Sequence, residues 1–206
     1  MLIFSAQNLA FIAVPKTGTT AVEMALKGKA DVIFTKRRKH ITAQRFHTRV
    51  APFLKEEFGI APERFAVIRE PEAQIRSWYR YRARQAKAGS AFSTGDISFD
   101  RFVRDVISDD PPAYAGIGSQ FAFLTSGTGE VLVHHLFAHE MPERLGAFLD
   151  DRFGGPVELK ARNVSPLIPA DLEPGTLKLL KVARAAEYDL HARVLDAGGH
   201  LVSALP

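Results

Sequence analysis

The stretch FIAVPKTGTT, Phe11–Thr20, followed by AVEMAL, Ala21–Leu26, decides the fold that we expect for this chain. An apolar run leads into a turn with Lys16 and Gly18, and the turn leads into a segment of helical character. This order of strand, loop and helix forms an anion site, because the first N–H groups of a helix lack partners and lie at the positive end of its dipole. Lys16 adds a positive charge, and the hydroxyls of Thr17, Thr19 and Thr20 add further donors.

The loop differs from the common nucleotide-binding loop of ATPases and GTPases, which reads G-x-x-x-x-G-K-[ST]. In this chain Lys16 precedes Gly18, and no glycine lies before it in the loop. A plain turn with a helix cap is the alternative for the loop alone, because threonine and glycine favour that position. The loop by itself therefore predicts an anion site and leaves the ligand open.

A second segment, FAVIREPEAQIRSWY at Phe65–Tyr79, has the same order of strand and helix. Its first four residues read as a short buried strand, and Pro71 suits the first turn of a helix, where its missing N–H costs nothing. Arg69 lies at the strand end and Ser77 lies about two turns into the helix. A guanidinium fork and a hydroxyl can converge on one phosphate. An ordinary salt bridge of Arg69 is the alternative.

The two segments resemble the phosphate-binding motifs of the PAPS-dependent sulfotransferases, whose sulfuryl donor is 3′-phosphoadenosine-5′-phosphosulfate. The run from Pro15 to Thr20 resembles the 5′-phosphosulfate loop of that family. The 3′-phosphate segment is matched at Arg69, Pro71, Ser77 and Tyr79. The family often has Arg where this chain has Gln74. Weaker likeness extends the resemblance over most of the chain, at Val133 to Glu140, at Arg162 to Ser165 and at Tyr188 to Leu190.

The resemblance implies a single α/β domain over residues 1–206, with a P-loop-like parallel sheet and helices on both faces, the sulfotransferase fold. It implies PAPS as co-substrate, no metal, and a small-molecule or carbohydrate acceptor. Lys16 would assist the leaving phosphate and the loop N–H groups from Gly18 to Thr20 would hold the 5′-phosphate. Arg69 and Ser77 would hold the 3′-phosphate, and Arg162 would close over the nucleotide from a C-terminal loop.

The pattern along the chain also predicts strands alternating with helices, which form a parallel sheet covered on both faces. Strands are expected at residues 9–14, 31–34, 65–69 and 131–137. Helices are expected at residues 19–29, 43–58, 71–86, 98–107, 142–153 and 169–195, the last interrupted near Pro174. Ligands bind beyond the carboxyl ends of such strands, where Lys16 and Arg69 are expected.

An acceptor hydroxyl also needs a general base. His40 is the candidate, because it follows the second expected strand and precedes a helix near the carboxyl edge of the sheet. A surface or helix-capping role is the alternative for this histidine. The rival bases are His47, Glu23 and Glu70.

The composition fits one compact core, with 206 residues of which 46% are hydrophobic. The net charge of +4 suits an anionic ligand, and no nucleic-acid-binding signature accompanies the basic stretches. Cysteine is absent, which excludes disulfides and a cysteine nucleophile. No signal peptide or membrane-spanning run is recognisable, so we expect a cytoplasmic protein without stable membrane insertion. The oligomeric state stays open.

Two other functions remain open from the sequence. One is a nucleotide or small-molecule kinase of P-loop type, which would use the same strand, loop and helix. The other is a non-catalytic nucleotide-binding module that keeps the phosphate loop.

Overall fold

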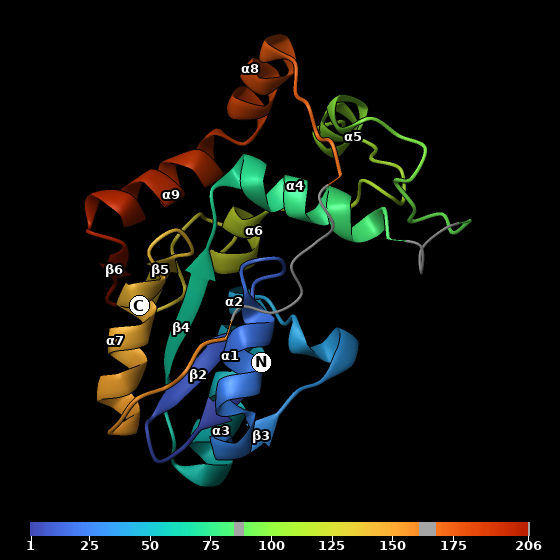
Figure 1. Cartoon of the computed structure of the whole chain (residues 1–206). Helices are drawn as coiled ribbons and strands as arrows, with labels where there is room; N and C mark the ends of the chain where they lie inside the picture. Colours follow the sequence, from blue (N-terminus) through green and yellow to red (C-terminus); the bar gives the residue numbers. More distant parts are fainter. Residues whose placement is uncertain (85–88, 161–167, 206) are drawn as a thin grey trace.

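The computed structural model describes residues 1–84, 89–160 and 168–205, so Arg162 lies outside the described residues. A mixed sheet forms the centre, with the strand order β3-β1-β2-β4-β5-β6 (Figure 1). The strands are β1 (Leu2–Phe4), β2 (Leu9–Ile12), β3 (Val32–Ile33), β4 (Glu63–Ile68), β5 (His135–Ala138) and β6 (His200–Val202). The α/β class is confirmed, and β2, β4 and β5 are parallel to one another as predicted, with β4 between the other two.

The edges of the sheet differ from the prediction, because β1 and β6 were not expected and both pair antiparallel with their neighbours. β1 and β2 are joined through residues 5–8 alone, and so short a connection permits only an antiparallel pair. β6 returns through Gly198 and Gly199, whose φ angles of 70° and 85° favour glycine. The expectation of a purely parallel sheet was therefore wrong outside the centre.

Nine α-helices lie within the described residues, and most follow the predicted ranges. They are α1 (Thr19–Leu26), α2 (Ala43–Arg45), α3 (Ala51–Phe58), α4 (Pro71–Arg82), α5 (Phe99–Val106), α6 (Gln120–Leu124), α7 (Pro142–Phe153), α8 (Pro174–Ala183) and α9 (Ala185–Asp196). The expected restart near Pro174 is confirmed, because α8 begins there with proline in its first turn, but residues 169–173 before it are not helical. The break between α8 and α9 falls at Arg184.

The helix expected at 43–58 is divided by a π-helical segment, Phe46–Val50, between α2 and α3. Pro52 has no N–H with which to bond the carbonyl four residues earlier. The N–H of Ala51 bonds to Phe46 O, five residues back, which is the π-helical pattern. The proline therefore explains the change of helix type.

Helices cover both faces of the sheet, because successive side chains of a strand point to opposite faces. On β2, Leu9 and Phe11 pack in the cluster that includes residues of α1 and α7. Ala10 and Ile12 pack in the opposite cluster, to which α2, α3, α6 and α9 contribute. All four residues are fully buried, and this burial of apolar area is the main term that stabilises the sheet.

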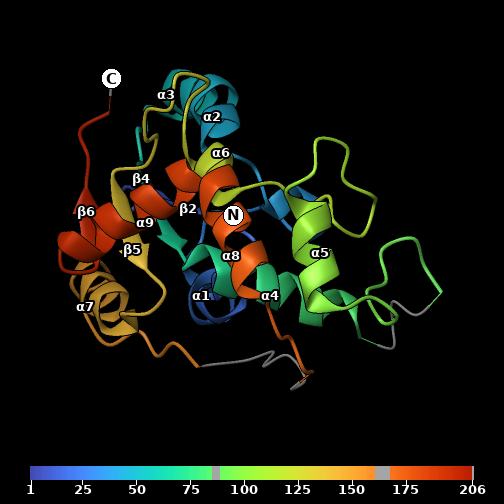
Figure 2. The same ribbon diagram turned by 90° about the horizontal axis from the view of Figure 1, so that it is seen from above.

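A third apolar cluster joins α4, α5 and α8, which lie together beyond the carboxyl ends of the parallel strands (Figures 1 and 2). Phe102 and Leu180 are fully buried in it, from α5 and α8. Tyr79 of α4 contacts the rings of Phe99 and Phe102. This cluster fixes the direction in which α4 crosses the top of the sheet.

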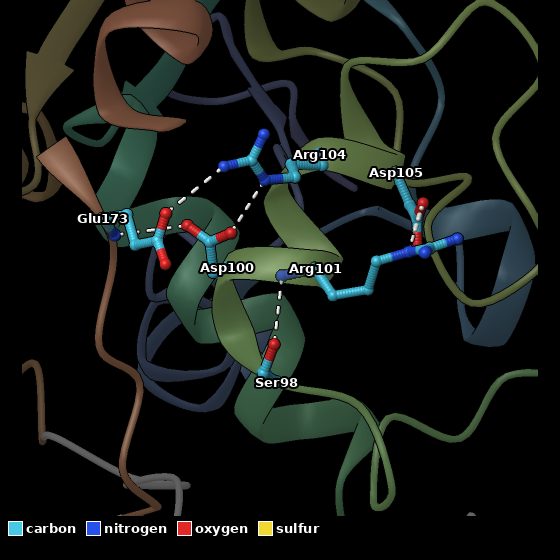
Figure 3. Close-up of polar contacts among 6 residues, drawn as sticks. All are labelled: Ser98, Asp100, Arg101, Arg104, Asp105 and Glu173. Atoms are coloured by element: carbon cyan, nitrogen blue, oxygen red, sulfur yellow. Dashed lines mark hydrogen bonds and ion pairs between the residues drawn. The ribbon is translucent and has the colours of Figure 1, made fainter. Parts of the chain in front are cut away.

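Polar contacts also connect α5 to the beginning of α8 (Figure 3). Ser98 caps α5, as predicted, by accepting a 3.2 Å hydrogen bond from Arg101 N. Asp100 accepts from Arg104 Nε at 2.8 Å and from the N–H of Glu173 at 3.2 Å. Arg104 and Glu173 form a 3.5 Å ion pair. These contacts orient α8 against α5, while exposed pairs of this kind add little stability. Among the described residues, no helix is long and apolar enough to cross a membrane.

Candidate functional site

A cavity of about 570 Å³ lies at the carboxyl ends of the three parallel strands, below α4. Lys16 follows β2 by a short loop, Arg69 follows β4 directly, and His139 follows β5 directly. All three line the cavity, together with Ser77 of α4 and His40. The two sequence segments that carry Lys16 and Arg69 therefore meet in one site, because β2 and β4 are adjacent and parallel.

The loop after β2 has the conformation of an anion cradle. Lys16 and Gly18 both have positive φ angles, 67° and 81°, and Gly18 is the N-cap of α1. Within the described residues, the backbone N–H groups of residues 16–20 form no backbone hydrogen bond, and the first turn of α1 has no acidic residue. Gly18, Thr19 and Thr20 line the cavity. Free donors at a helix N-terminus and adjacent hydroxyls favour an anion there.

Thr17 has a different place from the other threonines of the loop. Its side chain is 3% exposed, and its hydroxyl donates a 2.9 Å hydrogen bond to Val14 O. It is not among the residues that line the cavity. Its hydroxyl thus holds the loop to the end of β2 and is not directed to a ligand.

Gln74 connects the loop to α4. Its side-chain Nε2 donates a 3.1 Å hydrogen bond to Pro15 O, and the residue is 4% exposed. This is the position at which the sulfotransferase motif often has Arg. Here a neutral amide ties α4 to the loop after β2, so the departure from the motif has a structural role.

Lys16 has no acidic partner within the described residues. Its Nζ lies 4.4 Å from the ring centroid of Tyr81 and 6.0 Å from that of Trp78, which are cation–π contacts. The pKa of Lys16 is lowered from 10.5 to about 8, mainly by burial and then by the charges of Arg84, Arg69 and Lys39 in that order. The amine is still mainly protonated at neutral pH, and a bound anion would raise its pKa again.

The backbone of Arg69 is held by Gln120 of α6. The N–H of Arg69 donates to Gln120 Oε1 at 2.9 Å, and Gln120 Nε2 donates to Arg69 O at 2.8 Å and to Glu187 Oε1 at 2.9 Å. Burial lowers the pKa of Arg69, while the charges of Glu140 and Glu70 oppose that shift. In the described part of the chain its guanidinium has no hydrogen bond or ion pair, so its donors remain available in the cavity.

His40 is half-buried at the wall of the cavity formed by the segment after β3. Its Nδ1 lies 2.7 Å from Ala13 O, and because a carbonyl only accepts, this nitrogen carries the hydrogen. The lone pair of the neutral ring is therefore on Nε2. Burial is the main cause that lowers the pKa of His40 below 6.5, so the ring is neutral and can accept a proton near pH 7.

The three rival bases are engaged elsewhere and do not line the cavity. His47 Nδ1 lies 3.2 Å from Arg64 NH1. Glu23 pairs with Lys39 Nζ at 3.0 Å. Glu70 caps α4 by accepting from Ala73 N at 2.6 Å. Of the predicted bases, the structure brings only His40 to the cavity.

Several residues of the cavity were not assigned from the sequence. His139 lies opposite the loop, where a β-carbon at Gly18 would be 3.6 Å from its ring. Burial lowers the pKa of His139, and the charge of Arg69 adds to this. The cavity is also lined by Arg76, Arg80 and Arg84. The i, i+4 spacing of Arg76 and Arg80 on α4 was a usable signal, because it places them on one side of the helix, and Arg84 follows two residues after the helix ends. None of the described side chains that line the cavity is acidic.

Comparison with protein-family models, with curated proteins and with solved structures finds no match. The described residues also contain no group of three or more His, Cys, Asp or Glu side chains placed to hold a metal ion. The argument for a function therefore rests on the chemistry and geometry of the cavity.

Proposed function

We propose that this protein is a PAPS-dependent sulfotransferase that transfers a sulfuryl group to a hydroxyl of a carbohydrate or another small acceptor. The observation that carries the proposal is the meeting of Lys16 and Arg69 in one cavity without acidic side chains. Each belongs to a segment whose residues resemble a phosphate-binding motif of that family. The donor carries its phosphates at the two ends of one ribose, which matches two separate cationic residues.

Under this proposal each residue has a defined task. The N–H groups of Gly18 to Thr20 bind the 5′-phosphate, while Arg69 and Ser77 bind the 3′-phosphate. The acceptor oxygen attacks sulfur as the bond between sulfur and the bridging oxygen breaks. Lys16 stabilises the negative charge that develops on that oxygen, and His40 Nε2 takes the proton of the acceptor hydroxyl. Positioning and charge stabilisation supply most of the rate in such a transfer.

The absence of acidic residues from the described cavity lining also favours PAPS over a magnesium nucleotide. Magnesium is normally bound through one or two carboxylates in addition to the phosphates. A kinase would need such a group near the loop. Trp78 and Tyr81 supply apolar surface in the same cavity, against which an acceptor ring can pack.

Thermal unfolding in the presence of nucleotides tests the proposal. We expect adenosine 3′,5′-bisphosphate to raise the melting temperature, because ligand binding to the folded state adds stability and relieves repulsion among the cavity cations. At a concentration one hundred times its dissociation constant, the ligand adds about 2.7 kcal/mol. Stabilisation by Mg-ATP alone, without an effect of the bisphosphate, would contradict the proposal and favour a kinase.

Replacement of His40 by alanine tests the assignment of the base. We expect turnover to fall by about 10²-fold or more, with little change in nucleotide affinity, because a general base contributes in that range. Wild-type turnover should decline as the pH falls through the lowered pKa of His40, below 6.5, since protonation removes the lone pair. The variant should lose this acid limb. His47→Ala is the matched control outside the cavity. A fully active His40→Ala variant would exclude His40 as the base.

A further inference from the structure

Four cations line the cavity without an ion pair to any acidic side chain of the described residues. They are Lys16, Arg69, Arg80 and Arg84. The other two cations of the lining, Lys39 and Arg76, are paired with Glu23 and Glu72. The proposed function uses only Lys16 and Arg69 of the four, so the roles of Arg80 and Arg84 remain to be explained.

Arg84 lies beside Lys16. The Arg84 guanidinium carbon is 5.3 Å from the ring centroid of Tyr81, and Lys16 Nζ is 4.4 Å from the same centroid. Both cations thus share one aromatic ring, which offsets part of their repulsion. The charge of Arg84 is the first to follow burial among the causes that lower the pKa of Lys16.

Arg80 lies on the side of Arg69. Its Nε donates a 3.3 Å hydrogen bond to Ile168 O, which leaves the two NH₂ groups of its guanidinium for other partners. Its charge is among those that lower the pKa of Arg69, after burial. Arg80 lies three positions after Ser77 on the same side of α4, whereas Arg84 follows two residues after the helix ends at Arg82, and all three line the cavity.

We propose that these cations act as two pairs, Lys16 with Arg84 and Arg69 with Arg80, and that each pair binds one phosphate group of a ribose 3′,5′-bisphosphate. The inference rests on the proposed function and deepens it. Arg80 and Arg84 become specificity-determining residues, because each supplies the second cation of one binding point in the cavity. A nucleotide with a single phosphate would occupy one pair and leave the other pair uncompensated.

Three nucleotides separate the two pairs: adenosine 3′,5′-bisphosphate, 3′-AMP and 5′-AMP. Trp78, the single tryptophan of the chain, lines the cavity and provides a fluorescence signal for each titration. Arg80→Gln should weaken the bisphosphate and 3′-AMP at least tenfold and change 5′-AMP less than twofold. Arg84→Gln should weaken the bisphosphate and 5′-AMP at least tenfold and change 3′-AMP less than twofold.

The controls separate this inference from the proposed function. Arg45→Gln removes one charge at an exposed position outside the cavity and should leave all three affinities unchanged. Wild-type protein that binds none of the three nucleotides would refute the proposed function itself. Two results would refute the pairing alone. One is that both cavity variants bind the bisphosphate as tightly as the wild type. The other is that each variant weakens the binding of 3′-AMP and of 5′-AMP equally. Melting curves establish that each variant is folded. Where a Gln variant does not fold, Arg80→Lys or Arg84→Lys takes its place in the titrations.

Discussion

Replacement of Lys16 by alanine is expected to reduce the rate of sulfuryl transfer by at least a hundredfold. In the proposed reaction Lys16 stabilises the oxygen that leaves sulfur, and loss of one preorganised donor to a developing negative charge commonly costs 10² to 10³ in turnover, about 2.7 to 4 kcal/mol. The nucleotide would still be held by the loop N–H groups and by Arg69, so its affinity should change less. The measurement is transfer of labelled sulfate from PAPS to a mixture of hydroxyl acceptors.

The pH dependence provides a second measure of the same residue. Because burial lowers the pKa of Lys16 to about 8, the amine is charged below that pH and loses its charge above it. We therefore expect kcat/KM to fall as the pH rises through about 8 and Lys16→Arg to move this limb to higher pH, since kcat/KM reports the free enzyme. Lys27→Ala is the exposed control. Full turnover in Lys16→Ala would show that the charge is not used in the reaction.

Replacement of Arg69 by alanine is expected to raise the dissociation constant for adenosine 3′,5′-bisphosphate at least tenfold, which is about 1.4 kcal/mol. Within the described residues its guanidinium has no hydrogen bond or ion pair, and the residue is half-buried in the cavity, so its donors are available to the 3′-phosphate. Charge-assisted hydrogen bonds from such a group are among the stronger ones in proteins. Titration calorimetry measures the constant directly.

The same titration with 5′-AMP provides the internal control for Arg69→Ala, because that nucleotide lacks the 3′-phosphate. Its affinity should remain within about twofold of the wild-type value, well inside the 1.4 kcal/mol that marks a tenfold change. Gln120 holds the backbone and not the guanidinium of this residue, so we expect the variant to keep its fold. An unchanged constant for the bisphosphate would remove Arg69 from the site.

The centre of the fold was predictable because its signals are local. β2 is a continuous apolar run, and β4 contains one from Phe65 to Ile68, and such runs favour buried parallel strands. Ser98 and Pro142 marked the beginnings of α5 and α7 correctly. Beyond the strand ends, the meeting of Lys16 with Arg69 followed from the adjacency of β2 and β4.

The rest depends on contacts between distant segments. β1 and β6 have three residues each and gain their stability from pairing, so their own sequences carry little signal. Thr17 has the same residue type as Thr19 and Thr20, and only its place in the folded loop directs its hydroxyl to Val14 O. His139 enters the cavity because β5 lies next to β4, a neighbourhood that no local pattern reports.

Two hydrogen bonds described above hold the loop between β2 and α1 in place. Thr17 donates to Val14 O within the loop, and Gln74 of α4 donates to Pro15 O. The loop is therefore already ordered when the chain folds, so the entropy cost of ordering it on ligand binding is small. The left-handed backbone of Lys16 is maintained in the same way by its surroundings. Preorganisation of this kind lets a small, highly charged molecule be recognised by a site that is already shaped for it.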